Sequence, residues 1–251
     1  MNYENRIVAF IDILGFAELV KQTVNDKEPA LAEQKLNALY YVVEYVTDFI
    51  RLSRDEIGFE GDTKTTLFSD SIVISIDKAN SHGILAIFRA LKKLQIHLIK
   101  DGILLRGGIV HGKLIHKDDI LIGPGLINAY RLESSSALYP RIVIDPKVTY
   151  LYSRQGGKTM GKMRIRHFDY HKTFSKDSDG TSYIDYFNDV SNYLNSGTIE
   201  NYIKELDSII KRFIRNDDIG IRMKYMWMRE KLKQSEYAAL IPKPVKKIKK
   251  P

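Results

Sequence analysis

One acidic residue inside an apolar, strand-like run constrains this chain more than any other feature. Residues 6–13 read RIVAFIDI, a β-rich run with apolar residues on both faces, and Asp12 is the only acid within it. A buried carboxylate must be paired, hydrogen-bonded or bound to a metal, because burying a lone charge is very costly. The alternative is that Asp12 ends the strand and caps the following helix, as aspartate often does. Either way, the fold must give this carboxylate a partner.

Helical and strand patterns alternate along the first 145 residues. Apolar residues at three-to-four spacing predict helices that start near residue 17, span residues 31–52 and 83–100, and begin again at residue 127. β-rich runs predict a hairpin over residues 63–76 and strands over residues 104–115, 120–122 and 141–144, with a polar turn at residues 116–119. Helices and antiparallel hairpins that share one sheet indicate an α+β sandwich of the ferredoxin-like kind.

The chain changes character after residue 150, which suggests three parts. Residues 1–150 form the main domain, and residues 151–240 form an extension that starts polar, turns at residues 177–180 and ends in two helices. We expect the extension to pack on the same folded unit, because the apolar faces of its helices need cover. Residues 241–251 contain five lysines and are expected to form a flexible basic tail.

Composition excludes several classes of site and partner. The chain has no cysteine, which rules out disulfides, zinc–thiolate sites and cysteine nucleophiles and suits a reducing cytosol. We expect a cytoplasmic protein without a membrane span, since no run reaches about 18 apolar residues and the start lacks a signal-peptide pattern. The net charge is +8, but the five tail lysines supply more than half of it, so direct nucleic-acid binding is not expected.

Asp70 is the natural partner of Asp12. It lies in LFSDSIV at residues 67–73, a polar residue between two apolar strand halves, and taken alone it is typical of a hairpin turn. Two carboxylates at neighbouring sheet edges are what Mg²⁺ or Mn²⁺ ions require, because these hard cations take oxygen ligands. Gly15 permits close backbone approach, and the N–H groups of Gly15 and Phe16 at a helix start would form an anion site.

Four segments resemble, in order, the motifs of class III nucleotidyl cyclases. They are FIDILGF at residues 10–16, Ser69-Asp70, LRGGIVHG at residues 105–112 and GPGLINAYR at residues 123–131. The resemblance covers residues 6–145 and implies a ferredoxin-like cyclase sandwich with a C-terminal helical extension. It also implies a homodimeric enzyme that closes a nucleoside triphosphate into a 3′,5′-cyclic nucleotide and releases pyrophosphate.

The resemblance further implies roles for the matching residues. Asp12 and Asp70 would bind two divalent ions, Mn²⁺ or Mg²⁺, with the backbone carbonyl of Ile13 as a further ligand. Arg131 would stabilise charge on the α-phosphate, reaching across a head-to-tail homodimer from the other subunit. The substrate would contact Phe10, Gly15, Phe16 and Thr66, with Thr66 beside the base. Arg106 would support either a phosphate or the sheet edge, and the structural role at the sheet is the one expected.

Departures from the family pattern narrow the substrate. Ile127 stands at the usual position of a transition-state asparagine, and Thr66 and Ile120 stand where purine cyclases carry their base-reading pair. The whole pattern, with DGTSYIDY at residues 179–186, is similar to the pyrimidine cyclases of Pycsar anti-phage systems. This similarity implies UTP as substrate, with CTP as the alternative. The cyclic UMP or cyclic CMP product would then activate a separate effector protein.

Two other classes of function compete with this interpretation of the sequence. The Ile127 departure leaves open a catalytically degenerate cyclase domain that binds nucleotide without turnover. An RNA- or DNA-binding ferredoxin-like domain would carry exposed aromatic residues and basic strips on its central strands, whereas these strands carry acids. The histidines are expected to be ordinary surface residues rather than metal ligands: His111, His116, His167 and His171.

Overall fold

A mixed sheet runs through the centre of the computed structural model, which describes residues 2–25, 27–48, 62–77, 81–118, 120–159, 173–194 and 198–243. The strand order is β2-β3-β1-β4-β6-β8-β7, and β5 pairs with β4 to one side. Only the β4–β6 pairing is parallel among these strands. The strands are β1 (Glu4–Ile13), β2 (Thr63–Phe68), β3 (Ser71–Asp77), β4 (Leu105–Lys117), β5 (Ile120–Ile122), β6 (Ile142–Ile144), β7 (Phe174–Lys176) and β8 (Ser182–Ile184).

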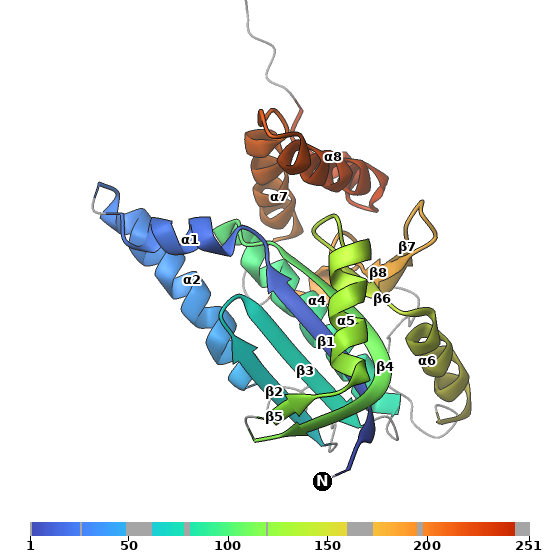
Figure 1. Cartoon of the computed structure of the whole chain (residues 1–251). Coiled ribbons are helices and arrows are strands. Elements are labelled where there is room, and N and C mark those ends of the chain that lie inside the picture. The colour runs from blue at the N-terminus through green and yellow to red at the C-terminus, as the bar shows by residue number, and fades with distance from the viewer. Residues whose placement is uncertain are drawn as a thin grey trace, which may run out of the picture.

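Helices cover both faces of the sheet, and Figure 1 shows α5 in front of it and α4 behind. The helices are α1 (Phe16–Thr23), α2 (Pro29–Thr47), α4 (Ser81–Leu98), α5 (Pro124–Ser136), α6 (Pro146–Thr159), α7 (Ile199–Phe213) and α8 (Ile219–Gln234). Short 3-10 helices lie at Ile99–Asp101, Ser191–Tyr193 and Ala238–Leu240. The predicted α+β class with C-terminal helices is therefore confirmed.

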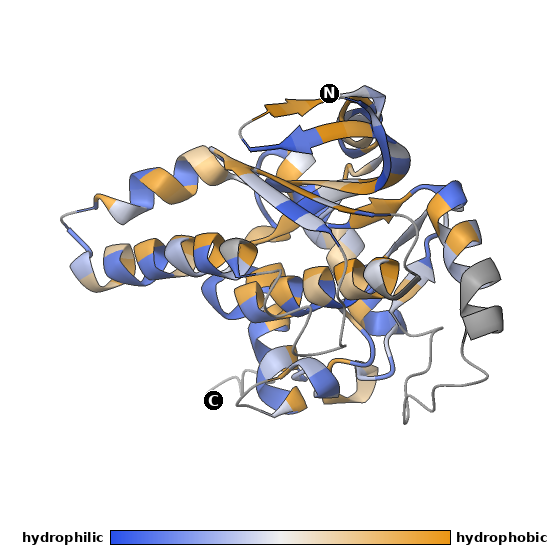
Figure 2. Cartoon of the chain, turned by 90° about the horizontal axis from the view of Figure 1, so that it is seen from below, coloured by the Kyte–Doolittle hydropathy of each residue, from blue (hydrophilic) through white to orange (hydrophobic). Residues whose placement is uncertain are grey.

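The main hydrophobic core lies between the sheet and the helices α2 and α4. Alternate residues of β1 point into it, including Ile7 and Ile11, because successive strand side chains point to opposite faces. β3 contributes Ile72, Ile74 and Ile76 to the same core. Figure 2 shows apolar and polar residues mixed along the long helices, the pattern of amphipathic helices that cover a sheet.

Glycines of β4 let α5 lie directly on the opposite face of the sheet. A Cβ atom at Gly108 would lie 2.6 Å from the carbonyl oxygen of Ala129, and one at Gly112 would lie 2.8 Å from the Cα of Gly125. No side chain fits at those distances. The glycine-rich run of β4 is thus explained by helix packing, which also fixes where the residues of α5 meet the sheet.

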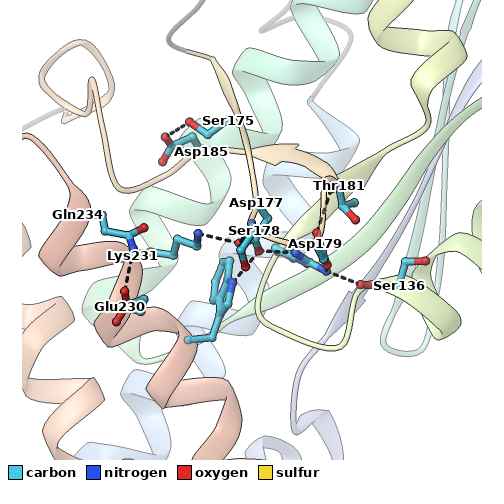
Figure 3. Close-up of polar contacts among 12 residues, drawn as sticks. Ser136, Ser175, Asp177, Ser178, Asp179, Thr181, Asp185, Glu230, Lys231 and Gln234 are labelled. Atoms are coloured by element: carbon cyan, nitrogen blue, oxygen red, sulfur yellow. Dashed lines mark hydrogen bonds and ion pairs between the residues drawn. The ribbon is translucent and has the colours of Figure 1, made fainter.

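The C-terminal helices are joined to the sheet by a second core and a buried charged cluster. Residues of α4, β8, α7 and α8 share the second core, among them Ile96, Leu206 and Met228. Figure 3 shows the cluster around Asp177, just after β7. The Asp177 carboxylate pairs with Arg141, accepts a hydrogen bond from Trp227 Nε1 at 2.7 Å and pairs with Lys231 Nζ at 2.6 Å. Through these contacts α8 and β6 are held to the same carboxylate.

Most predicted elements of the first 145 residues are confirmed, and two expectations were wrong. The predicted hairpin is β2–β3, while α2 ends at Thr47 and residues 49–52 lie outside the described part of the chain. The predicted polar turn at residues 116–119 begins too early, because β4 continues to Lys117. His116 is 3% exposed, so its expected surface position was wrong. No helix in the described ranges is long and apolar enough to span a membrane.

Candidate active site

The hairpin between β2 and β3 brings Asp70 to the end of β1, where Asp12 lies. Ser69 has a φ of 56°, a left-handed conformation that closes the two-residue turn. The Ile13 N–H then donates to the Asp70 carbonyl oxygen at 3.2 Å, which ties the turn to β1. Asp70 lies close enough for its negative charge to raise the pKa of Asp12. The two acids singled out in the sequence are therefore neighbours.

Arg106 and Glu133 complete this group of charges. Arg106 lies opposite Asp12 on β4, and its Nε–H donates to Asp12 Oδ2 at 2.7 Å. The same Nε lies 2.7 Å from Glu133 Oε1, on the face of α5 that packs on the sheet. Glu133 is 2% exposed, and its Oε1 is held by this ion pair without a well-aligned hydrogen bond. One guanidinium therefore pairs with two carboxylates, and the charge of Asp70 acts on both of them.

The pKa shifts reflect this excess of negative charge. Burial raises the pKa of Asp12, the hydrogen bond and charge of Arg106 lower it, and the charge of Asp70 raises it again, with a net rise. Burial also raises the pKa of Glu133; Arg106 opposes the rise, and Asp12 and Asp70 add to it. Carboxylates held in this state gain from an added cation.

The acids fit a hard divalent cation. Asp12 and Asp70 supply carboxylate oxygens, and Glu133 beside them shares Arg106 with Asp12, so the group keeps an excess of negative charge. No group of three or more His, Cys, Asp or Glu side chains with metal-binding geometry occurs among the described residues. A cation here would therefore rely on two carboxylates and complete its shell with substrate or water oxygens, as Mg²⁺ commonly does.

The start of α1 follows β1 directly and offers free backbone donors. Gly15 has a φ of 72°, and a Cβ there would meet nothing within 4 Å, so the backbone conformation rather than crowding favours glycine. The N–H groups of Gly15 and Phe16 have no acceptor among the described residues, as is usual in the first turn of a helix. The Phe16 side chain packs against the main core. The donors thus lie three or four residues beyond Asp12.

Phe10 and Thr66 share one sheet face with Asp12. Asp12, Ser71 and Phe68 lie side by side in one row across β1, β3 and β2. Phe10, Val73 and Thr66 form the same kind of row two residues along. From strand geometry the Cα atoms of Thr66 and Asp12 are about 12 Å apart, combining about 7 Å along the strands with two strand spacings of about 4.8 Å. Phe10 packs edge-to-face on Tyr130, with ring centroids 5.6 Å apart. The Thr66 hydroxyl lies 2.8 Å from His116 Nε2.

Arg131 is not brought to the two aspartates of its own chain. The buried residues Ala129 and Glu133 mark the side of α5 that faces the sheet. Arg131 lies about 200° around the helix from either residue and is exposed. Ile127, one turn earlier, is 51% exposed on the same outward side. The structure therefore groups Asp12 with Asp70 and separates Arg131 from them.

Glu133 and His116 were not predicted as site residues from the sequence. Glu133 follows Gly125 and Ala129 at intervals of four, so an acid in the apolar stripe of a helix was the available signal. His116 has the same strand alternation as Arg106, but this is visible only once β4 is known to reach Lys117. His167 and His171 lie outside the described residues.

Comparison of this chain with known proteins finds similarity in structure only. No protein-family model matches the chain, and no curated protein matches it. Among solved structures it is similar to the adenylyl cyclase CyaB from P. aeruginosa, at 17% identity and a TM-score of 0.43, over 61% of this chain and 82% of that one. It is also similar to the monomeric guanylyl cyclase domain of the RhoGC fusion protein from the fungus Blastocladiella emersonii, at 15% identity and a TM-score of 0.46, over 73% and 96% of the two chains. A third similar structure is the adenylate/guanylate cyclase/hydrolase from Silicibacter pomeroyi, at 18% identity, a TM-score of 0.42 and coverage of 74% and 99%.

Proposed function

We propose that this chain is a class III-type nucleotidyl cyclase that converts UTP into 3′,5′-cyclic UMP and pyrophosphate. The observation that carries the proposal is the position of Asp12 beside Asp70 at one sheet end, next to Glu133, which shares Arg106 with Asp12. Such a group of oxygens suits divalent cations and the triphosphate they accompany. The anti-phage role, with a separate effector activated by the product, comes from the sequence resemblance and is part of the proposal.

The reaction joins two groups of one substrate molecule. The ribose 3′-oxygen forms a bond to the α-phosphorus, the bond from that phosphorus to the β-phosphate oxygen breaks, and the 3′-hydroxyl proton passes to water. Mn²⁺ or Mg²⁺ held by Asp12, Asp70 and the Ile13 carbonyl would supply activation of the 3′-hydroxyl and neutralisation of phosphate charge. Because both reacting groups belong to one molecule, positioning and charge stabilisation account for most of the catalysis.

The chain's own residues would hold the substrate along one sheet face. The N–H groups of Gly15 and Phe16 would donate to the β- and γ-phosphates, since a helix start favours anions. Phe10 would contact the nucleoside, and Thr66 would contact the base. Arg106 would act as a positioning residue, because its Nε contacts both Asp12 and Glu133.

The α-phosphate would be contacted by Arg131 of a second copy of the chain. The outward position of Arg131 supports this arrangement, and exposed apolar side chains on the same side of α5 and on the nearby hairpin support an interface. Phe68 is 79% exposed, Tyr130 is 53% exposed and Ile127 is 51% exposed. Burying such side chains between two copies would be favourable.

Two observations favour a second candidate, a nucleotide-binding module without turnover. Asp12 is already paired with Arg106, and Ile127 occupies the position of the usual asparagine. CTP in place of UTP is the alternative substrate within the first candidate. A single experiment separates these three possibilities.

The test is incubation of the purified protein with Mn²⁺ and each of the four nucleoside triphosphates, followed by identification of the product. Cyclic UMP is expected from UTP; cyclic CMP as the main product would replace UTP by CTP. Asp12→Ala and Asp70→Ala should each abolish cyclisation while the circular dichroism spectrum is retained. Asp217→Ala, an exposed acid before α8, is the matched control and should remain active. If no triphosphate is cyclised, even with phage components added, the enzyme proposal is overturned and nucleotide binding alone supports the second candidate.

A further inference from the structure

A chain of buried hydrogen bonds crosses four strands of the sheet and ends at Thr66. Arg6 Nε donates to Ser75 Oγ at 2.9 Å, Ser75 Oγ lies 2.8 Å from His116 Nδ1, and His116 Nε2 lies 2.8 Å from Thr66 Oγ1. Arg6, Ser75 and His116 are each at most 3% exposed. The chain runs from β1 through β3 and β4 to β2, on the face that also carries Asp12.

The donor-to-acceptor direction of this hydrogen-bond chain is fixed at its Arg6 end. A guanidinium only donates hydrogen bonds, so Ser75 Oγ accepts from Arg6. Arg6 is itself held by Asp62 Oδ2 and Glu4 Oε2, each at 2.6 Å, so it stays charged and in place. The Ser75 hydroxyl proton has one acceptor among the described residues, His116 Nδ1. Ser75 therefore donates to the imidazole ring.

The hydrogen bond from His116 to Thr66 has the same donor-to-acceptor direction as the one from Ser75 to His116. A neutral imidazole carries one proton, so a ring whose Nδ1 accepts must carry its proton on Nε2. Burial, aided by the positive charges of Arg6 and Lys64 and opposed by Asp62, lowers the pKa of His116 to about 4. The ring is therefore neutral at pH 7, and Nε2–H donates to Thr66 Oγ1.

Thr66 is left as a donor. Its oxygen accepts from His116, and its own hydroxyl proton has no acceptor among the described residues. Thr66 lies on the sheet face of Asp12 at about 12 Å, a span comparable with that from the phosphates of a nucleotide to the far edge of its base. A base bound there would therefore meet a hydroxyl whose proton needs an acceptor.

We propose that Arg6, Ser75 and His116 are positioning residues that fix Thr66 as a hydrogen-bond donor, so that the site selects uracil over cytosine. The inference rests on the proposed function and deepens it. The carbonyl O4 of uracil accepts the Thr66 proton. The amino group at the same position of cytosine is a donor, and Thr66 can accept from it only if its own proton is turned away from every acceptor. A site built to hydrogen-bond one group discriminates against a base that leaves the partner unsatisfied.

The direction of the chain is tested on the nucleotide-free protein by ¹⁵N NMR of its histidine rings, since the two neutral tautomers have different nitrogen shifts. The His116 signals are assigned by comparison with His116→Gln. At pH 7 we expect a proton on Nε2 and none on Nδ1. A proton on Nδ1, or on both nitrogens, overturns the inference whatever the enzyme does.

The selection is tested by kcat/KM for UTP and for CTP. Wild type should favour UTP by on the order of 10-fold or more, and Thr66→Val and Ser75→Ala should bring the ratio towards one. Ser75 is fully buried and cannot touch the substrate. A changed UTP-to-CTP ratio in Ser75→Ala therefore reports on the hydrogen-bond chain that ends at Thr66. Thr65→Val is the matched control, because Thr65 points to the other face of β2, and it should keep the wild-type ratio.

The outcomes separate this inference from the proposed function. An unchanged ratio in Ser75→Ala, or a wild type that favours CTP, overturns the inference and leaves cyclisation intact. A wild type that cyclises neither triphosphate but binds UTP more tightly than CTP in calorimetry overturns the catalysis and supports the inference. Absence of both activity and binding preference overturns both.

Discussion

Replacing His116 should remove a pH dependence from the stability of this protein. In the folded chain the pKa of His116 is lowered from 6.5 to about 4. Between these values the unfolded chain binds a proton that the folded chain does not, so stability falls as pH falls. The window is about 2.5 pH units, and each unit corresponds to about 1.4 kcal/mol, which gives a loss of about 3 kcal/mol from this residue.

Denaturant unfolding of wild type and His116→Gln from pH 7 to pH 4 measures this effect. The variant should be less stable at pH 7 by about 1–2 kcal/mol, because it loses hydrogen bonds. Its free energy of unfolding should also fall by about 3 kcal/mol less than that of wild type over the window. Asp12 and Glu133 have raised pKa values and act in the opposite direction, but they are present in both proteins and cancel in the difference.

Thr66→Val is the control for this measurement, because it removes a hydrogen bond from the same ring without removing the titrating group. It should keep most of the wild-type pH dependence. If His116→Gln and wild type lose stability in parallel as pH falls, the buried neutral state of His116 is refuted, and the direction of the hydrogen-bond chain loses its support.

Three further substitutions test the packing and charges around the site by denaturant unfolding. Gly108→Ala should cost about 1–3 kcal/mol, because its Cβ meets the backbone of α5. Gly220→Ala near the start of α8 should change stability by less than about 1 kcal/mol, because its Cβ meets only the movable side chain of Asp218, at 3.2 Å. Asp177→Ala should cost about 3–5 kcal/mol, because Lys231 loses its carboxylate partner and Arg141 keeps only the half-exposed Asp179, whereas the exposed Glu230→Ala should change stability by less than about 0.5 kcal/mol. Glu133 has a raised pKa, so its contribution makes the free energy of unfolding fall as pH rises above 4.5. Glu133→Gln should make this fall smaller. Equal values for a variant and its control, or an unchanged pH slope in Glu133→Gln, would contradict these assignments.

The parts of the site that the sequence predicts are those set by local signals. Asp12 stands out because one acid interrupts an apolar strand, and Asp70 stands out because a polar triplet separates two β-rich halves. Both features depend on residues within a few positions. Their meeting depends only on β1 and β3 being neighbours, which an antiparallel hairpin packed on the first strand makes natural.

The parts that could not be predicted depend on pairings between distant residues. His116 was expected at the surface because the run from His116 to Asp119 is polar, yet the register of β4 with β5 places it opposite Leu121 and extends the strand. Its burial then follows from contacts with Ser75 and Thr66 on other strands. β7 and β8 have three residues each, too few to show an alternation, so the sequence predicted only a polar segment with a turn at residues 177–180.

The position of Arg131 makes the proposed site incomplete within one chain. In the proposed site, one copy would supply the acids and the helix start for the phosphates and Thr66 for the base, but its own Arg131 lies on the far side of α5. If a second copy supplies this cation, specific activity should rise with protein concentration until the dimer forms. Mixing inactive Asp12→Ala with inactive Arg131→Ala should then restore activity, since one of the two mixed sites keeps both residues. A specific activity that is constant down to concentrations where the chain is monomeric, with no recovery on mixing, would place the α-phosphate contact on the same chain instead.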